Sequence, residues 1–464
     1  MPYLQLETFL DKSASKALNA EFKGKLKYNI GQYDKSVVNG KQQFIDLELA
    51  RKLAKNVKWK AIENLDIMLL EFESNFTKRG GKVLWASDIA EAQNFILEIC
   101  KKHEASSVVK SKSMTTEEIH LNDFLEKNNI ESVETDLGEY IQQLDGETPF
   151  HIVTPAMHKS KEDCARVFET KLGEAPGLTP LQMTGIARRN LRKKYTQAKV
   201  GITGANFLLA DIGGVSVTEN EGNARLTTTF PDVHIAIAGI EKILPSINDL
   251  SLFLPLLATF GTGQNVTVYN TIFTGAAHSK EIDGPKEMYV ILLDNGRSEL
   301  LAQIKQREAL YCIRCGSCLN ACPVYKNIGG HTYDTTYSGP IGSVISPHFE
   351  GMEKFRHLSF ASSLCGNCTE ACPMHINLHN MLLYNRRDSV EQKITTTGER
   401  FTWRVFKYLM LKRKRINRGG VLIKNKMLSL MFKTSWGNNR SMIQLAPKSF
   451  EQLWNDNEKK EKAK

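Results

Sequence analysis

Seven of the nine cysteines in this chain fall into two short groups whose spacing is that of an iron–sulfur protein. The first group reads Cys-x2-Cys-x2-Cys-x3-Cys-Pro from Cys312 to Pro323, and the second reads Cys-x2-Cys-x3-Cys-Pro from Cys365 to Pro373. The first spacing lets three thiolates from one tight turn hold three corners of a [4Fe–4S] cluster. Paired Cys-x2-Cys units also bind zinc, but a four-ligand zinc site needs no such run. The cysteines therefore predict iron–sulfur clusters and electron transfer.

The last cysteine of such a run, directly before proline, points away from its own group and ligates the other cluster. This exchange predicts two clusters, each built from both groups, and the first of them is expected to be [4Fe–4S]. The expected ligands are, for the first cluster, Cys312, Cys315, Cys318 and Cys372, and for the second cluster, Cys322, Cys365 and Cys368.

The second group is one cysteine short. When the register is counted back from Cys372, the position that corresponds to Cys312 is occupied by Ser362. The second cluster would then be [3Fe–4S], or [4Fe–4S] with its last iron held by water, by the Ser362 oxygen or by a partner. The sequence alone leaves the type and the fourth ligand of this cluster open.

The rest of the composition bounds the class of protein. At 464 residues the chain is long enough for two or three domains with sizeable cores. Hydrophobic residues make up 41% of it, and no run of about 20 uncharged apolar residues predicts a transmembrane helix. The N-terminus lacks the apolar segment of a secretory signal. Only Cys100 and Cys164 lie outside the two groups, which is no disulfide framework, so we expect a reducing, cytoplasmic location.

Much of the net charge of +10 lies near the C-terminus. From Arg400 to Arg440 there is no acidic residue, and basic side chains alternate with apolar ones at helical spacing. Such an extension packs its apolar side on the preceding domain, docks on an acidic partner subunit, or makes peripheral contact with an anionic membrane; all three alternatives stay open. Nucleic-acid binding is not expected, because the aromatic positions follow core spacing and no recognition motif accompanies them.

The pattern of apolar residues divides the chain into four segments. Residues 1–70 are charged and helical in pattern. In residues 71–297 short apolar runs alternate with helical patterns, which indicates a parallel α/β sheet. Residues 298–390 open with an expected helix from Ser298 to Ala309, and the long stretch between their cysteine groups favours a helical ferredoxin-like domain. Residues 391–464 form the basic amphipathic extension.

Eight strands are expected in the α/β segment, and a further strand–helix unit is expected to open at residues 151–158. The expected strands are 82–86, 106–113, 130–136, 200–210, 213–220, 233–239, 266–275 and 288–296.

Several stretches of the sequence resemble a known family. Similarity to the LUD domain of lactate utilization proteins is seen in residues 110–118, 134–141, 203–214, 219–226, 234–245 and 283–285. The two cysteine groups and the segment between them resemble the ferredoxin part of the lactate utilization protein B family, and the basic tail matches that family's extension. The resemblance implies an α/β LUD domain, similar in fold to sugar-phosphate isomerases and a folate cyclo-ligase, followed by a helical two-cluster domain and a helical basic extension.

The resemblance further implies the iron–sulfur subunit of a three-protein cytoplasmic complex that oxidises L-lactate to pyruvate and allows growth on lactate. Its partners would be a cysteine-rich CCG-domain subunit and a smaller LUD-domain subunit. The missing eighth cysteine would be ordinary for this group, and a comparable three-cysteine site in the iron–sulfur subunit of succinate dehydrogenase holds [3Fe–4S].

Two other functions remain as alternatives. One is a self-contained iron–sulfur oxidoreductase with its substrate bound in the LUD domain, and the other is an iron–sulfur assembly module. The sequence carries no GxGxxG fingerprint of a flavin or nicotinamide site. No organic cofactor is therefore evident that would split a hydride into single electrons, which favours an electron-relay subunit.

Polar residues of the LUD segment would line a pocket for a small anion or a sugar-like ligand. Glycines in 201–214 mark places where backbone would approach such a ligand, and Lys110, Lys112 and Arg225 would supply positive charge for a carboxylate. The alternative is that these polar groups cap helices and fix turns. The candidate residues are Lys110, Lys112, Thr203, Asn206, Asp211, Glu219, Asn220, Glu221 and Arg225.

Four histidines stand near these elements. His151, His158 and His234 are expected to be structural rather than metal ligands or bases. His331 lies between the cysteine groups, and it is either a loop histidine bonded to backbone or a group that tunes or ligates the second cluster.

Overall fold

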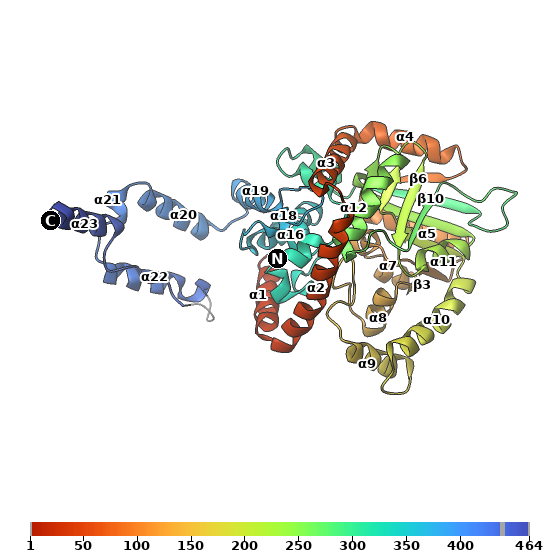
Figure 1. The fold of residues 1–464 in the computed structure, drawn as a ribbon, viewed down its shortest axis with the longest axis horizontal. Coiled ribbons are helices and arrows are strands. Elements are labelled where there is room, and N and C mark those ends of the chain that lie inside the picture. Colours follow the sequence, from red (N-terminus) through yellow and green to blue (C-terminus); the bar gives the residue numbers. More distant parts are fainter. Residues whose placement is uncertain (1, 437–440, 463–464) are drawn as a thin grey trace. The chain divides into compact units, whose positions relative to one another are not determined.

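The larger of two units contains a six-stranded parallel sheet, which is surrounded by helices (Figure 1). The structure, a computed structural model, describes residues 2–436 and 441–462, and the two units are Met1–Ser389 and Val390–Lys464. The strand order is β1-β10-β7-β4-β2-β3, and every pairing is parallel. The strands are β1 (Lys82–Ala86), β2 (Ser107–Lys110), β3 (Glu131–Glu134), β4 (Val200–Gly204), β7 (Val233–Gly239) and β10 (Glu287–Leu293).

This sheet confirms the parallel α/β prediction, and its central strand shows why the apolar runs were informative. All seven residues of β7 are buried, as expected when helices cover both faces of a parallel sheet. The helices packed around the sheet are α5 (Ile89–Lys102), α6 (Met114–Glu118), α7 (Leu121–Lys127), α8 (Leu137–Asp145), α9 (Lys161–Leu172), α10 (Pro180–Gln197) and α11 (Asn223–Thr229). Five of these seven helices begin at a side-chain cap, such as Asp88, Ser113 or Asp136, and α7 and α11 begin without one.

A second, four-stranded sheet in the order β8-β5-β6-β9 packs beside the first. The single strand expected over 200–210 is two strands, because the chain leaves the parallel sheet at the end of β4 and enters this second sheet in β5. Its elements are β5 (Phe207–Leu209), β6 (Gly214–Glu219), β8 (Ile243–Leu244) and β9 (Tyr269–Phe273), with the apolar helix α12 (Leu250–Thr262) before β9.

Residues 151–158 carry no strand, contrary to the expectation of a new unit there. The side chain of His151 accepts the N–H groups of Val153 and Thr154 at 3.1 and 3.2 Å, and the Phe150 N–H bonds to the Pro155 carbonyl at 3.0 Å. These local hydrogen bonds use donors that a strand ladder would need, so the segment folds as a turn.

The first 70 residues are helical, as expected, but they are not a separate core. Helices α1 (Pro2–Leu18), α2 (Ala20–Gly40), α3 (Leu47–Glu63) and α4 (Leu65–Thr77) bury Leu26, Ile30 and Phe72 in the same apolar cluster as Cys315 and Cys318. The N-terminal helices therefore fold together with both the sheet and the cysteine-bearing region.

Every regular element of the cysteine-bearing region is a helix. The single helix expected from Ser298 to Ala309 is split into α13 (Arg297–Ala302) and the 3-10 turn η4 (Arg307–Tyr311). The buried Gln306 side chain bonds to Asn385 and Asp388, and these bonds hold a turn between α13 and η4. The other helices are α14 (Ser317–Ala321), α15 (Tyr325–Ile328), the 3-10 turn η5 (His331–Tyr333), α16 (Gly339–Phe349), α17 (Met352–Phe360), α18 (Asn367–Glu370) and α19 (Leu378–Glu391).

The smaller unit is a set of helices whose apolar side chains are exposed. Helix α20 (Thr397–Met410) has the expected amphipathic pattern, and Phe401 and Trp403 are 67% and 60% exposed. The other helices are α21 (Arg413–Ile416), α22 (Val421–Trp436) and α23 (Phe450–Lys462). None of the helices in the described ranges is long and apolar enough to span a bilayer.

A buried chain of charges joins the sheet to the cysteine-bearing region. Glu118, at the end of α6, accepts from both terminal nitrogens of Arg297 at 2.8 Å, and the Arg297 Nε donates to Glu241 at 2.5 Å. Glu241 lies in the 3-10 turn η2 (Ile240–Lys242) and also accepts from Arg314 at 3.2 Å. Burial alone would raise the pKa of Glu241, but Arg297 and Arg314 lower it to about 2, so this carboxylate stays ionised.

Replacing Arg297 with Met is expected to reduce the free energy of unfolding by about 3–5 kcal/mol, because Glu118 and Glu241 would lose a buried partner. The measurement is the urea midpoint of the anaerobically prepared protein, followed by circular dichroism. Arg387→Met is the matched control, since Arg387 pairs with Asp388 at the surface and such pairs contribute at most about 1 kcal/mol. Equal midpoints for the two variants would contradict the role given to the buried chain.

Candidate iron–sulfur centres and adjoining cavity

Four of the seven cysteines line one small cavity. Cys312 and Cys315 come from the loop before α14, Cys318 from α14 itself, and Cys372 from the loop after α18. Burial raises the pKa of the Cys318 thiol, and the nearby sulfurs of Cys312, Cys315 and Cys372 raise it further. The other side chains that line this cavity are almost all apolar, and include Ile152, Ile313, Ile341, Met374, Ile376 and Leu378.

The other three cysteines form a second set. Burial raises the pKa of Cys368 to about 11, and the neighbouring Cys322 and Cys365 contribute to that shift. Cys365 is exposed, whereas Cys368 is buried. Cys368 also acts on the pKa of Cys318, so the two sets adjoin each other. The first set is thus deep in the protein, and the second reaches its surface.

Backbone N–H groups surround these sulfurs. The Arg314 N–H donates to the Cys312 sulfur at 3.4 Å. Burial raises the pKa of Cys322, and the N–H groups of Tyr325 and Val324, which bond to its sulfur, offset part of that rise. Hydrogen bonds to cluster sulfurs are one of the means by which proteins set cluster potentials. The gathered thiols, the apolar lining and these donors fit iron–sulfur clusters, which would supply one-electron acceptors at these positions.

The two cysteine turns are repeats of one backbone conformation. Arg314 and Leu364, each directly before a cysteine, have φ values of +60° and +54°, and Gly316 and Gly366 follow those cysteines with φ of +78° and +83°. A short helix starts after each glycine. Positive φ at non-glycine residues is costly and is kept where surrounding structure requires it, as at ligand-binding turns.

Ser362 occupies the place in the second turn that Cys312 occupies in the first. The Leu364 N–H donates to the Ser362 Oγ at 3.1 Å, just as the Arg314 N–H donates to the Cys312 sulfur. The register counted from the sequence is therefore also the spatial register. Within the second turn, Ser362 is thus the residue that corresponds to Cys312.

The loop that carries Cys372 is fastened from two sides. The guanidinium of Arg51, in α3, donates to the Cys372 carbonyl at 3.2 and 2.7 Å and to the Glu370 carbonyl at 2.9 Å. The Ser317 hydroxyl, in α14, donates to the Ala371 carbonyl at 3.0 Å. These bonds hold the Cys372 loop of the second cysteine group against α14 of the first group. One of the two residues that make them, Arg51, belongs to the N-terminal segment.

A larger cavity of about 440 Å³ lies at the carboxyl edge of the parallel sheet, where α/β proteins usually bind ligands. It is bordered by the residues that follow β2, β3, β4 and β7 and by one residue of the first cysteine turn, Arg314. Five of the nine LUD residues predicted from sequence line it: Lys112, Asn206, Glu219, Asn220 and Glu221.

Several of these five residues also cap and fix the backbone. Glu219 accepts the N–H groups of Ala224 and Arg225 at 2.6 and 3.0 Å, and Glu221 accepts the Leu137 N–H at 3.0 Å. The two interpretations offered by the sequence are therefore compatible, because a capping carboxylate also presents an oxygen to the cavity.

The four remaining residues of that set do not line this cavity. Lys110 is fully buried and pairs with Glu117 and Glu134 at 2.7 and 2.6 Å. Thr203 bonds to His234 at 2.8 Å. The other two have local partners: Asp211 accepts from the Ser246 hydroxyl and the Ile247 N–H, and Arg225 lies over the Tyr269 ring.

Sequence reasoning missed two cations of the cavity, Lys242 and Arg314. Lys242 ends the 3-10 turn that follows the buried strand β7, and a charged residue so close to a strand end is a usable signal because carboxyl ends of strands meet at one edge. Arg314 lies between Cys312 and Cys315, where the cysteine pattern drew attention away from it.

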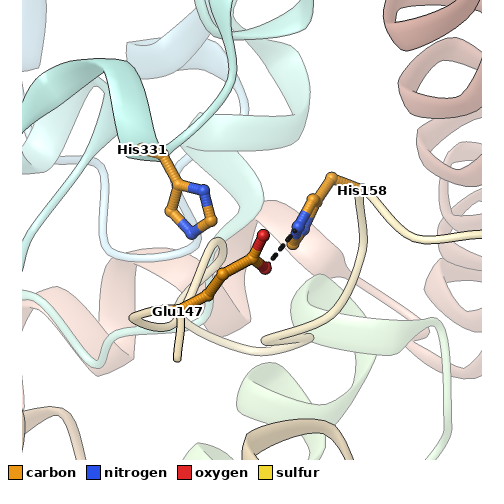
Figure 2. Close-up of side chains that lie close together, drawn as sticks. All are labelled: Glu147, His158 and His331. Atoms are coloured by element: carbon orange, nitrogen blue, oxygen red, sulfur yellow. Dashed lines mark hydrogen bonds and ion pairs between the residues drawn. The ribbon is translucent and has the colours of Figure 1, made fainter. Parts of the chain in front are cut away.

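Two of the four histidines, His158 and His331, lie beside Glu147 (Figure 2). Glu147 lies between two imidazoles, and its carboxylate contacts His158 at 2.9 Å and the Lys159 ammonium at 3.0 Å. His331 bonds to the Thr148 carbonyl at 2.7 Å, as expected for a loop histidine that bonds to backbone. Two imidazoles and a carboxylate within 4.8 Å are also a zinc ligand set, but here the Lys159 ammonium supplies the cation that Glu147 needs.

The comparisons with known proteins agree with this architecture. Residues 69–293 match the family described as LUD domain, and residues 308–376 match the one described as 4Fe-4S dicluster domain. The lactate utilization protein B of Bacillus cytotoxicus is 46% identical over 343 residues, which cover 74% of this chain and 72% of that protein. Its counterpart in Bacillus subtilis is 43% identical over 344 residues, with the same two shares.

A crystal structure of a DUF162 family protein from Deinococcus radiodurans aligns with 50% of this chain and 98% of its own, at 13% identity and a TM-score of 0.28, which is too low to argue from. The fold and the domain matches define a LUD-domain protein that continues into a helical 4Fe–4S dicluster domain. The chain belongs to the lactate utilization protein B family.

Changing Cys372 to Ser is expected to damage the cluster of the first set, because its sulfur shares a cavity with Cys312, Cys315 and Cys318. The readout is EPR of the reduced protein together with its iron content. Cys365→Ser is the matched control, which should affect the other cluster and so assign the two signals. If both variants lost the same signal, each cysteine group would close its own site and the exchange of ligands would be disproved.

Ser362→Ala is expected to leave the iron content and the EPR line shape of the second cluster nearly unchanged, because a protonated hydroxyl is a poor ligand for iron beside thiolates. Ser362→Cys should convert a labile or [3Fe–4S] site into a stable [4Fe–4S] one, since the side chain already stands in the ligand register. Loss of the second cluster in the alanine variant would instead identify the Ser362 oxygen as a ligand.

Proposed function

We propose that this chain is the iron–sulfur electron-transfer subunit of a cytoplasmic complex that oxidises L-lactate to pyruvate and allows growth on lactate. The observation that carries the proposal is the arrangement of seven cysteines in two adjoining sets, one buried beside the LUD cavity and one that reaches the surface at Cys365. The shared name of the relatives, lactate utilization protein B, supplies the substrate.

Two adjoining clusters suit the electron count of this reaction. Conversion of lactate to pyruvate releases two electrons and two protons, whereas each cluster accepts one electron at a time. With a buried first cluster and an exposed second one, electrons would enter at the LUD side, cross to the second set between Cys318 and Cys368, and leave near Cys365. The expected ligands are the exchanged sets, and the second cluster is [4Fe–4S] with a non-cysteine fourth ligand or [3Fe–4S].

The partners in this proposal are a cysteine-rich CCG-domain subunit and a smaller LUD-domain subunit. Helix α20 offers them a surface, because Phe401, Trp403 and Phe406 are exposed among basic side chains. The same combination of apolar and basic groups suits an anionic membrane surface, which is the alternative contact for this extension.

A second candidate is a self-contained oxidoreductase that binds its substrate in the LUD domain. One observation favours it, namely that the large cavity borders the first cysteine turn at Arg314. In this case the chain alone would pass electrons from substrate to clusters, whereas a relay subunit would need its partners.

We expect the anaerobically reconstituted chain to hold two clusters, with about seven to eight irons, because seven thiolates are available in exchanged sets. L-lactate should leave the visible absorbance of the isolated chain unchanged and should bleach it once the two partner subunits are added. Bleaching of the chain alone would favour the self-contained enzyme. About four irons, or stoichiometric zinc, would contradict the two-cluster proposal itself.

A further inference from the structure

Two buried cations of the large cavity have donor groups that the protein does not use. Arg314 gives one N–H to Glu241 at 3.2 Å, but its Nε and Nη1 are buried and have no hydrogen-bond partner in the described part of the chain. Lys242 is 8% exposed, and within the described ranges it forms no ion pair, because Glu241 pairs with Arg297 and Arg314 instead. Both side chains line the cavity.

Buried donors without a hydrogen-bond partner destabilise the folded protein. A buried charge without a counter-charge loses its hydration and is normally paired or serves a ligand. Burial, and then the nearby Arg314, lower the pKa of Lys242 to about 8, which shows how poorly its charge is compensated in the protein alone. An anion that enters the cavity would restore the balance at both side chains.

We propose that this cavity binds a small monocarboxylate of the 2-hydroxy or 2-oxo acid class, with its carboxylate held between Lys242 and Arg314. The inference rests on the proposed function, and it names the place where the substrate or the product of the complex is held. The free Nε and Nη1 groups of Arg314 lie on different edges of the guanidinium, so a carboxylate would take an N–H from one of them and a point charge from the Lys242 ammonium.

The other charges of the cavity favour one negative charge over several. Among the described residues, Asp136, Glu219 and Glu221 also line it and outnumber the one further cation, Lys112, so a phosphate or a dicarboxylate would meet like charges there. Burial and the neighbouring Asp136 raise the pKa of Glu221 to about 7, which shows that this wall already resists further negative charge. The cavity volume of about 440 Å³ lies within the usual range of ligand sites, and a three-carbon acid would fill only part of it.

The bound acid would lie beside the first cluster. Arg314 lies between Cys312 and Cys315 in the chain, and its backbone N–H donates to the Cys312 sulfur at 3.4 Å. Ile152 lines both this cavity and that of the first cysteine set. A negative charge at this position opposes the addition of an electron to the cluster, so ligand binding should lower its reduction potential.

The first test is calorimetric titration of the anaerobic protein, loaded with both clusters, with L-lactate, pyruvate, methyl lactate and inorganic phosphate. L-lactate and pyruvate should bind saturably, while the uncharged ester and phosphate should bind at least tenfold more weakly. Lys242→Met should weaken binding of both acids at least tenfold at unchanged iron content. Lys286→Met is the matched control, because that lysine is exposed on the same domain and pairs with Asp232, and it should bind like the unmodified protein.

The second test is a redox titration followed by EPR, with and without saturating pyruvate. The potential of the first cluster should fall when pyruvate is bound, that of the second should change less, and Arg314→Gln should remove the difference.

Absence of binding, tighter binding of phosphate, or unchanged affinity in Lys242→Met would each overturn the inference. If the chain binds neither acid but still accepts electrons from its partners, the inference fails and the proposed function stands. If it binds both acids but accepts no electrons from the partners, the proposed function fails instead.

Discussion

The arrangement of the whole larger unit depends on a buried chain of alternating charges. Glu118, Arg297, Glu241 and Arg314 connect a helix of the LUD domain, the turn after β7, the helix after β10 and the first cysteine turn. Each of these groups would be costly to bury alone, and each has an oppositely charged partner only when its neighbour in the chain of charges is in place. The LUD domain and the cysteine-bearing domain therefore fold onto each other, and the first cysteine turn becomes a wall of the LUD cavity.

The N-terminal helices complete this assembly. Arg51 holds the carbonyl of Cys372, and the loop so positioned carries the sulfur that lies with the first cysteine set. A protein that must pass electrons between domains benefits from such a rigid connection, because cluster positions and hydrogen bonds to sulfur set the potentials. The same connection places a cation-lined cavity and a cluster site on opposite sides of one turn.

Much of this could be predicted from the sequence, and the exceptions have physical causes. The cysteine spacing and the buried strands were evident because both are local patterns. The strand expected over 200–210 breaks between two sheets, and the helix expected from Ser298 breaks at Gln306, because distant partners decide both. Lys110 is used in a buried ion pair with Glu134, whereas Lys242 and Arg314 reach the cavity, and no spacing rule distinguishes these cases.

The central claim is that two clusters are built from exchanged cysteine groups beside the LUD cavity. The most direct measurement is a crystal structure of the anaerobic protein with anomalous diffraction recorded at the iron edge. Two separate iron peaks are expected, one bonded to the sulfurs of Cys312, Cys315, Cys318 and Cys372, and one bonded to those of Cys322, Cys365 and Cys368. A single peak, or a cluster held by Cys312, Cys315, Cys318 and Cys322, would contradict it.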